Sequence, residues 1–357
     1  MSQWTARRQR LKQWLAQHEA DAFLVSSAAN VRYLFGFRGE GLGVVASVSA
    51  LCTDRRYELD AAALPGRIER VLHPAGHLEG AIEHLRALGA RKVAFESQAL
   101  TFATFEQLRK KLRGVKLLPT SGVVEGFRAV KSPEEIALIA RAAEVTDQAL
   151  AAILPLLKPG VTEREVALEL DRQLVMHGGE RPAFETIVAF GPSAACPHAV
   201  PGPRVLEPGQ MVKIDCGARV DGYCADITRT VPVGKPDARL QQVYGAVLEA
   251  QQAAIAAARA GLACKDLDAV ARDVLRCHGL AEQFGHGLGH GVGLEIHELP
   301  AVSTRSQDVL RRGMVVTIEP GVYIEGWGGV RIEDTVAIEA RGCQVLTRTP
   351  KWEVSGA

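Results

Sequence analysis

The sequence predicts an α+β protein with two domains, a smaller α/β domain over residues 1–124 and a larger one over residues 125–357. The length of 357 residues suits about two domains of roughly 150 residues each. Helical and strand patterns alternate through the first third of the chain, which is typical of an α/β domain. After a break near residues 119–126, helix-start signals and then β-rich segments follow, so the second domain mixes both kinds of element.

The first domain opens with an amphipathic pattern, because Leu11, Trp14 and Leu15 stand at helical spacing. Short apolar runs at 22–25 and 43–52 each predict one strand. The remaining elements expected in this domain are helices at 76–88 and 101–112 and strands at 93–95 and 115–118.

The second domain begins with two capped helices. Ser132 is a capping residue, and Pro133 suits the first helical turn. The apolar spacing then predicts a helix that runs to residue 157. The segment Thr162 to Glu165 is a capping box that opens a second helix. Two further helices are expected at 237–260 and 266–277.

Charge and cysteine usage exclude several classes of protein. The formal net charge is +1, so nothing favours nucleic acid or an anionic membrane as a partner. The charged N-terminal residues lack the apolar core of a secretory signal, and no apolar run is long enough to span a bilayer. The seven cysteines are odd in number and show no CxxC spacing, which indicates reduced thiols and a cytoplasmic protein.

Two aspartates are predicted to share one face of a hairpin. The segment MVKIDCGARVDGYCAD places Asp221-Gly222 between two strand-like runs, which is a strong two-residue turn signal. Counting outward from this turn pairs Asp215 with Thr228 and leaves Asp215 and Asp226 as diagonal neighbours. Their like charges favour a divalent cation between them. The ordinary alternative is a pair of solvated aspartates, and Asp221 itself is interpreted as a turn residue.

A glycine-rich segment, FGHGLGHGVGLEIHE, brings three histidines close together in sequence. Glycine at every second position would cost a helix about 1 kcal/mol each, so His286 and His290 do not form a helical HExxH site. In extended backbone, residues an even number apart point the same way, so these two histidines can share one side if no bulge intervenes. His297 follows after a short apolar stretch and arrives from a neighbouring position.

Two late strand patterns carry glutamates. In VVTIEPGVY, Glu319 stands at the end of a strand before a Pro-Gly turn. In GGVRIEDTVAI, alternation places Glu333 on the same face as Arg331, and a carboxylate in such an apolar context needs a partner or a metal. The alternative to a metal site is that Glu333 forms an ion pair with Arg331 and has a purely structural role. Asp334 points the other way and is interpreted as a surface or hydrogen-bonding residue.

The order of Asp215, Asp226, His290, Glu319 and Glu333 resembles that of the pita-bread metallopeptidases, the family of methionine aminopeptidase, aminopeptidase P and prolidase. The resemblance covers the chain from about residue 127 onward. It implies a pita-bread catalytic domain preceded by a creatinase-like N-terminal domain. The segments that carry it are FRAVKSPEEI, IDCGARVDGYCADITRT, GHGLGHGVGLEIHE, TIEPGVY and VRIEDT.

The resemblance implies that these five residues hold two divalent metal ions. We expect Mn²⁺, and the mixed set of ligands also tolerates Co²⁺ or Zn²⁺. Asp226, His290 and one glutamate would hold one ion, and Asp215 with the remaining carboxylates the other. Glu319 would also act as the general base.

Four further residues receive roles from the same resemblance. His198 and His297 match catalytic histidines, while His286 and Arg331 match residues that bind substrate. A homodimer is likewise implied by the family alone.

The first domain narrows the expected activity. Methionine aminopeptidases usually lack such a domain, whereas aminopeptidase P and prolidase have it, and NVRYLFGF resembles part of theirs. We therefore expect hydrolysis of the Xaa-Pro bond of short peptides by a prolidase. The alternative is an aminopeptidase P that acts on tripeptides and longer peptides. Arg38 is a candidate to neutralise a dipeptide carboxylate in a neighbouring subunit's site.

Two functions of other classes remain as alternative hypotheses. The same fold can serve as a non-catalytic module that binds peptides or partners, although no expected metal ligand is missing here. A cysteine hydrolase that uses Cys216 or Cys224 is the weaker possibility, because the sequence specifies no base for either thiol.

Overall fold

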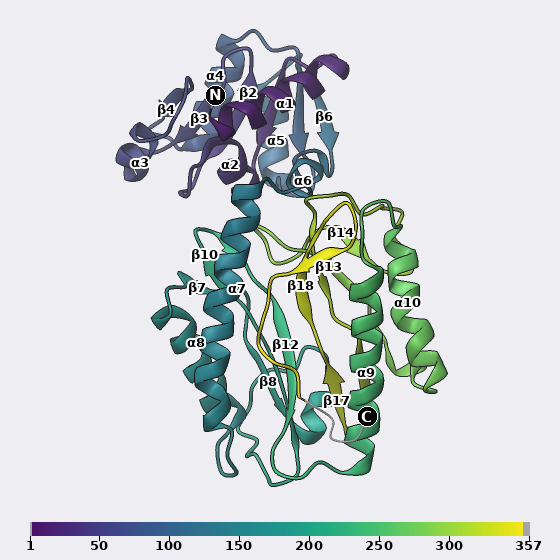
Figure 1. The fold of residues 1–357 in the computed structure, drawn as a ribbon. Helices are drawn as coiled ribbons and strands as arrows, with labels where there is room; N and C mark the ends of the chain where they lie inside the picture. The colour runs from purple at the N-terminus through teal and green to yellow at the C-terminus, as the bar shows by residue number, and fades with distance from the viewer. Residues whose placement is uncertain (1, 353–357) are drawn as a thin grey trace. The chain divides into compact units, whose positions relative to one another are not determined.

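The computed structural model describes residues 2–352, and the chain divides into two compact units, Met1–Phe127 and Arg128–Ala357 (Figure 1). The first unit is built on a mixed six-stranded sheet in the order β4-β3-β2-β1-β5-β6. β1 lies inside this sheet, antiparallel to β2 and parallel to β5. The strands of this unit are β1 Ala22–Val25, β2 Leu42–Ala46, β3 Ala50–Thr53, β4 Glu69–Leu72, β5 Lys92–Glu96 and β6 Lys116–Thr120. The helices are α1 Gln3–Gln17, α2 Ala28–Phe35, α3 Glu58–Ala62, α4 His77–Ala87, α5 Phe102–Lys111 and α6 Val123–Arg128, with a 3₁₀ turn at Arg55–Tyr57.

The predicted alternation of helices and strands is confirmed in this unit, but one predicted strand is wrong. Residues 43–52 form two antiparallel strands, β2 and β3, with Leu42 paired to Cys52. The chain reverses at Ser47 and Val48, which are exposed, and it does so without a glycine or proline. An uninterrupted apolar run therefore concealed a hairpin, because the usual turn residues are missing from it.

The second unit places strands between two pairs of helices. α7 and α8 lie along one side of the strands and α9 and α10 along the other (Figure 1). Its sheets have the orders β12-β9-β8, β11-β10-β7, β14-β13-β15-β18-β19 and β16-β17. The helices are α7 Pro133–Ile153, α8 Glu163–Met176, α9 Ala238–Ala257 and α10 Cys264–Cys277, with 3₁₀ turns at Leu154–Leu156, Gly191–Ala195 and Ala281–Gln283. The strands are β7 Arg181–Pro182, β8 Ile187–Phe190, β9 Met211–Cys216, β10 Ala218–Val220, β11 Tyr223–Cys224, β12 Ile227–Pro232, β13 Gly289–Gly291, β14 Glu298–Val302, β15 Val315–Ile318, β16 Gly321–Ile324, β17 Gly328–Arg331, β18 Asp334–Ile338 and β19 Cys343–Val345.

The predicted capping box at α8 is present, and the predicted capping residue Ser132 also forms a capping box at α7. The Ser132 hydroxyl accepts from the Glu135 N–H while the Glu135 carboxylate accepts from the Ser132 N–H, and Thr162 and Glu165 repeat this exchange at α8. α7 ends at Ile153, earlier than expected, and a 3₁₀ turn that contains Pro155 follows. Proline has no N–H to continue the helical ladder, which explains the early end.

The predicted aspartate hairpin is confirmed with its register. Val220 pairs with Tyr223, and Asp215 pairs with Thr228. Asp221 has a φ of 47° and Gly222 a φ of 77°, the two positive values that a type I′ turn requires. The turn therefore determines the pairing of β9 with β12, and through it the face on which Asp215 lies.

Gly217 supplies a test of this hairpin. A methyl group built on Gly217 would overlap the carbonyl oxygen of Ala225, which lies between β11 and β12. We expect Gly217→Ala to lower the free energy of unfolding by about 1–3 kcal/mol, measured by urea denaturation. The control is Gly245→Ala in α9, where nothing lies within 4 Å and the protein should gain about 0.5–1 kcal/mol. Equal effects of the two substitutions would contradict a close approach at Gly217.

Candidate metal centre

One cavity in the second unit is lined by all nine residues that were expected to bind metal, bind substrate or take part in catalysis. Its volume is about 520 Å³. It brings together segments that are far apart in the chain, from the β9–β12 hairpin to the strands after residue 315. The predicted residues that line it are Asp215, Asp226, His290, Glu319 and Glu333, together with His198, His286, His297 and Arg331.

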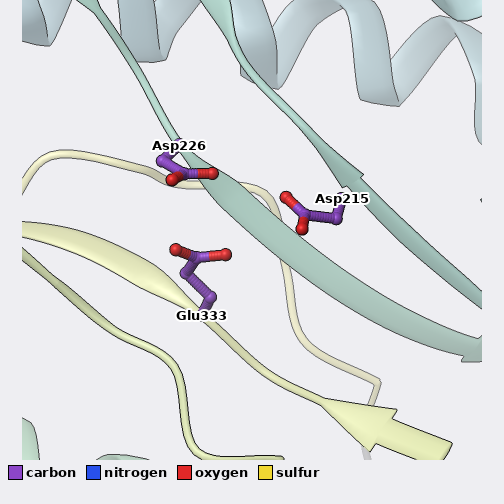
Figure 2. A group of neighbouring side chains, drawn as sticks. All are labelled: Asp215, Asp226 and Glu333. Carbon is purple, nitrogen blue, oxygen red and sulfur yellow. The ribbon is translucent and has the colours of Figure 1, made fainter. Parts of the chain in front are cut away.

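Three carboxylates form the centre of this cavity. Asp215 lies on β9, Asp226 directly precedes β12, and Glu333 lies between β17 and β18. Figure 2 shows their side chains pointing toward one another from these separate segments. One oxygen from each carboxylate lies within 4.8 Å of the others, and all three residues are buried. Oxygen atoms at this spacing are suited to a shared hard cation.

The protein alone leaves this negative charge poorly compensated. Burial, reinforced by the neighbouring carboxylates, raises the pKa of Asp226 and of Glu333 well above the usual range. Within residues 2–352, the Asp215 Oδ1 and Glu333 Oε1 atoms are buried and have no hydrogen-bond donor. Buried polar atoms are normally satisfied, so two such atoms in one cavity indicate a missing electropositive partner.

His290 and Glu319 complete the set. The His290 Nδ1 lies 3.0 Å from the Gly291 carbonyl oxygen, which can only accept, so Nδ1 carries the proton. Its Nε2 lone pair therefore faces Asp226 Oδ2 at 3.6 Å and Glu319 Oε1 at 3.5 Å. Burial raises the pKa of Glu319 to about 7. A lone pair that faces two carboxylates is repulsive unless a cation lies between them.

These observations fit a pair of divalent metal ions. Three carboxylates, a fourth on Glu319 and an imidazole nitrogen in the correct tautomer all converge on one space. The donor set is rich in oxygen with a single nitrogen, which suits Mn²⁺, Co²⁺ or Zn²⁺.

Arg331 places a positive charge directly beside these carboxylates. It is 2% exposed, and its guanidinium pairs with Asp215. It also donates to the Thr228 hydroxyl at 2.9 Å and to the Tyr323 hydroxyl at 2.8 Å. The sequence analysis gave an ion pair between Arg331 and Glu333 as the alternative to metal binding by Glu333. In the structure, Arg331 pairs with Asp215 instead.

His286 lies at the end of this chain of hydrogen bonds. Its Nδ1 bonds to the Gly287 carbonyl oxygen, so Nε2 accepts from the Tyr323 hydroxyl at 2.9 Å. Burial lowers the pKa of His286 to about 4 and raises that of Tyr323 to about 12. Both groups are therefore neutral near pH 7, and they connect Arg331 to the cavity wall.

The two remaining histidines are exposed at the cavity. His198 lies in the irregular segment after the 3₁₀ turn Gly191–Ala195, and His297 directly precedes β14. The ring of His297 lies 4.3 Å from the ring of His290, measured between centroids. Both exposed rings are thus within the same cavity as the proposed ligands and accessible to a bound substrate.

The sequence analysis missed several residues that support the site. One is Thr228, whose hydroxyl donates to Glu333 at 2.6 Å. The predicted hairpin register placed Thr228 beside Asp215, but it did not indicate this contact with Glu333. Glu298, next to His297, is held by Arg128 and by Lys131 at 3.2 Å. The sequence offered one signal for this buried cluster, the carboxylate that directly follows a candidate histidine.

Comparison with known proteins identifies the family of this chain. The sequence profile of metallopeptidase family M24 matches residues 137–340, and that of the creatinase/prolidase N-terminal domain matches residues 7–130. The chain therefore belongs to metallopeptidase family M24, and the predicted fold class, a pita-bread domain after a smaller α/β domain, is confirmed.

Individual relatives are similar along almost the whole chain. A Xaa-Pro dipeptidase from Pyrococcus horikoshii is 38% identical over 95% of this chain and 96% of its own. The solved structure of a Xaa-Pro dipeptidase from Bacillus anthracis has a TM-score of 0.95 at 37% identity, covering 98% of this chain and 99% of that one. The structure of an X-Pro aminopeptidase from Thermotoga maritima has a TM-score of 0.88 at 36% identity, covering 94% and 97%.

Metal binding is testable through stability. Adding Mn²⁺ to chelator-treated protein at about 100 times its dissociation constant should stabilise the fold by about 2.7 kcal/mol, because the ion binds only the assembled site. Glu333→Gln should lose most of this gain, because it removes the charge of a carboxylate at the centre of the cluster. Thermal unfolding with and without the ion provides the measurement.

Glu325 offers a matched control for this substitution. It is an exposed glutamate in the same unit and is not part of the carboxylate cluster. Glu325→Gln should retain the full Mn²⁺-dependent shift. If Glu333→Gln and Glu325→Gln responded alike, the ion would not bind at the proposed centre.

Proposed function

We propose that this metallopeptidase is a dinuclear-metal exopeptidase that hydrolyses the Xaa-Pro bond of dipeptides, which is the activity of a prolidase. The observation that carries the proposal is the single cavity in which all five expected metal ligands meet the histidines at its wall. Similarity to Xaa-Pro dipeptidases over almost the full chain supports the substrate class.

The chemistry of proline explains why such a site is needed. A proline nitrogen has no N–H and its ring restricts φ, so enzymes that bind substrate as a β-strand handle this bond poorly. When bound, a pair of divalent ions lowers the pKa of a water molecule and polarises the scissile carbonyl group. Asp215, Asp226, His290, Glu319 and Glu333 would hold those ions.

Glu319 is proposed to move the proton. It accepts the proton of the attacking water and passes it to the proline nitrogen as the C–N bond breaks. Its Oε1 accepts from the Thr317 hydroxyl at 3.2 Å, which orients the carboxylate. A bound cation favours the ionised form of a carboxyl group whose pKa burial otherwise raises, so the metal-loaded site keeps Glu319 able to accept.

The exposed histidines are proposed to act on the substrate. His297 stabilises the negative charge that develops on the carbonyl oxygen, and His198 positions the substrate near the leaving proline. Burial lowers the pKa of His297, so the neutral ring acts as a hydrogen-bond donor. We propose His286 and Arg331 as substrate-binding residues that act mainly by shaping the wall, because His286 bonds to the Tyr323 hydroxyl and Arg331 pairs with Asp215.

The proposal extends to the ion, the assembly and the compartment. Mn²⁺ is the proposed ion because the ligand set is rich in carboxylates. A homodimer is proposed from the family resemblance, and Arg38, exposed on a loop of the first unit, is the candidate partner for a dipeptide carboxylate.

A cytoplasmic location is proposed from the cysteines, all seven of which are free thiols. None of the helices in residues 2–352 is long and apolar enough to cross a membrane.

A panel of three peptides tests the activity. With Mn²⁺ restored, we expect cleavage of Ala-Pro and no cleavage of Met-Ala-Ala, with EDTA abolishing the activity. Cleavage of Ala-Pro-Ala but not of Ala-Pro would instead identify an aminopeptidase P, a result compatible with the Thermotoga maritima structure. Absence of cleavage with Mn²⁺, Co²⁺ or Zn²⁺ would point to a non-catalytic binding module.

The role of Glu319 has its own test. Glu319→Gln should lower kcat by about 10²–10⁴-fold, because the amide cannot accept the water proton. Metal content must be measured alongside, since Glu319 is also a proposed ligand, and kcat is compared at equal occupancy. Glu325→Gln is again the control and should keep its activity. Full activity in Glu319→Gln would refute the assignment of the base.

A further inference from the structure

A buried lysine lies on the same strand as the first metal ligand. Lys213 is on β9, two residues before Asp215, so both side chains leave the same face of the strand. Lys213 is 0% exposed. On the facing strand β12, Thr230 pairs with Lys213 and Thr228 with Asp215. The ammonium group is therefore in the layer of side chains that builds the centre, but it does not reach the solvent.

The ammonium of Lys213 binds one short segment of backbone. Its Nζ donates to the carbonyl oxygens of Cys196 at 2.6 Å, Ala194 at 3.2 Å and Pro197 at 3.3 Å. The next residue along the chain is His198. Residues 196–200 are neither helix nor strand, so their carbonyl groups lie outside the regular ladders. The buried cation therefore supplies hydrogen bonds that regular structure does not provide there.

A second buried cation shares this segment. Arg331 donates to the Pro197 carbonyl oxygen at 3.2 Å, while its guanidinium pairs with Asp215. The same segment is thus anchored to the strand that carries a metal ligand and to the arginine that pairs with that ligand. The Lys213 Nζ also lies 5.2 Å from the centre of the Tyr323 ring, which places the cation against an aromatic face.

We propose that Lys213 is a positioning residue that sets the place of His198 at the cavity by holding the segment 194–197. The role of His198 rests on the proposed peptidase function. A buried ammonium is less favourable than an apolar side chain of equal volume unless polar groups compensate it. Here the three compensating carbonyl groups all belong to the segment that leads into His198.

A double-mutant cycle separates this role from a general structural one. Lys213→Met keeps the side-chain volume but removes the donors, and we expect kcat/KM for Ala-Pro to fall about tenfold, because small displacements of a catalytic group are costly. In a His198→Ala background the same substitution should change kcat/KM by less than about twofold, since the positioned group is gone. An undiminished loss in that background would overturn the proposal.

Hydrogen exchange supplies a readout that does not depend on activity. In metal-free protein, the amides of residues 194–200 should exchange at least about tenfold faster in Lys213→Met than in the wild type, because local opening becomes easier. Unchanged exchange would contradict the proposal even if activity fell. If the wild type failed to cleave Xaa-Pro peptides, the proposed function would fail, while exchange would still report on the Lys213 contacts.

Arg70, an exposed residue of the first unit, provides a control with the same kind of contacts. It also holds three carbonyl oxygens, those of Ala61, Leu64 and Ile68. Arg70→Met should leave exchange at 194–200 unchanged and kcat/KM within about twofold of the wild type. A loss of activity as large as that of Lys213→Met would mean that removing any such cation has the same effect.

The Lys213→Arg variant keeps a cation with several donors and should retain more activity than Lys213→Met. If Lys213→Met failed to fold, the cycle with His198→Ala would be run with Lys213→Arg. Its smaller loss should again vanish when His198 is absent, and persistence of that loss would overturn the proposal.

Discussion

Mutual repulsion among buried carboxylates is the constraint on which the second unit depends. Asp226, Glu319 and Glu333 each have a raised pKa, because burial disfavours their charged forms. Arg331 compensates only part of this charge through its pair with Asp215. Such a cluster persists only where rigid elements hold its members, and two divalent cations would convert the repulsion into binding energy.

The surrounding elements provide that rigidity from several directions. The type I′ turn aligns β9 with β12, which places Asp215 beside Thr228. Asp334, fully buried, pairs with Arg229, and that arginine also donates to the Glu333 carbonyl oxygen at 2.5 Å. Glu333, a ligand of the proposed centre, is therefore held through its backbone as well as its side chain. This is expected for a site whose supporting residues orient the ligands.

Local patterns account for the features that the sequence predicted well. The turn at Asp221-Gly222 and the period of two along a strand are both short-range properties, so the hairpin register followed from counting residues. The glycine spacing around His286 and His290 excluded a helix, and the structure places His290 on β13. The misread strand at 43–52 and the unforeseen helix α2 have weak local signals: one turn without glycine or proline, and one helix of eight residues.

By itself, the sequence determined the types of residue at the centre, the hairpin that joins two of them and the family to which the chain belongs. Only the tertiary structure decided which partners these residues take. Arg331 pairs with Asp215 rather than Glu333, Asp334 takes the hydrogen-bonding role of its two predicted roles and lies in the interior, and Lys213 holds the segment before His198. The reason is physical: these contacts join residues from about 16 to 116 positions apart, and no local periodicity encodes such distances.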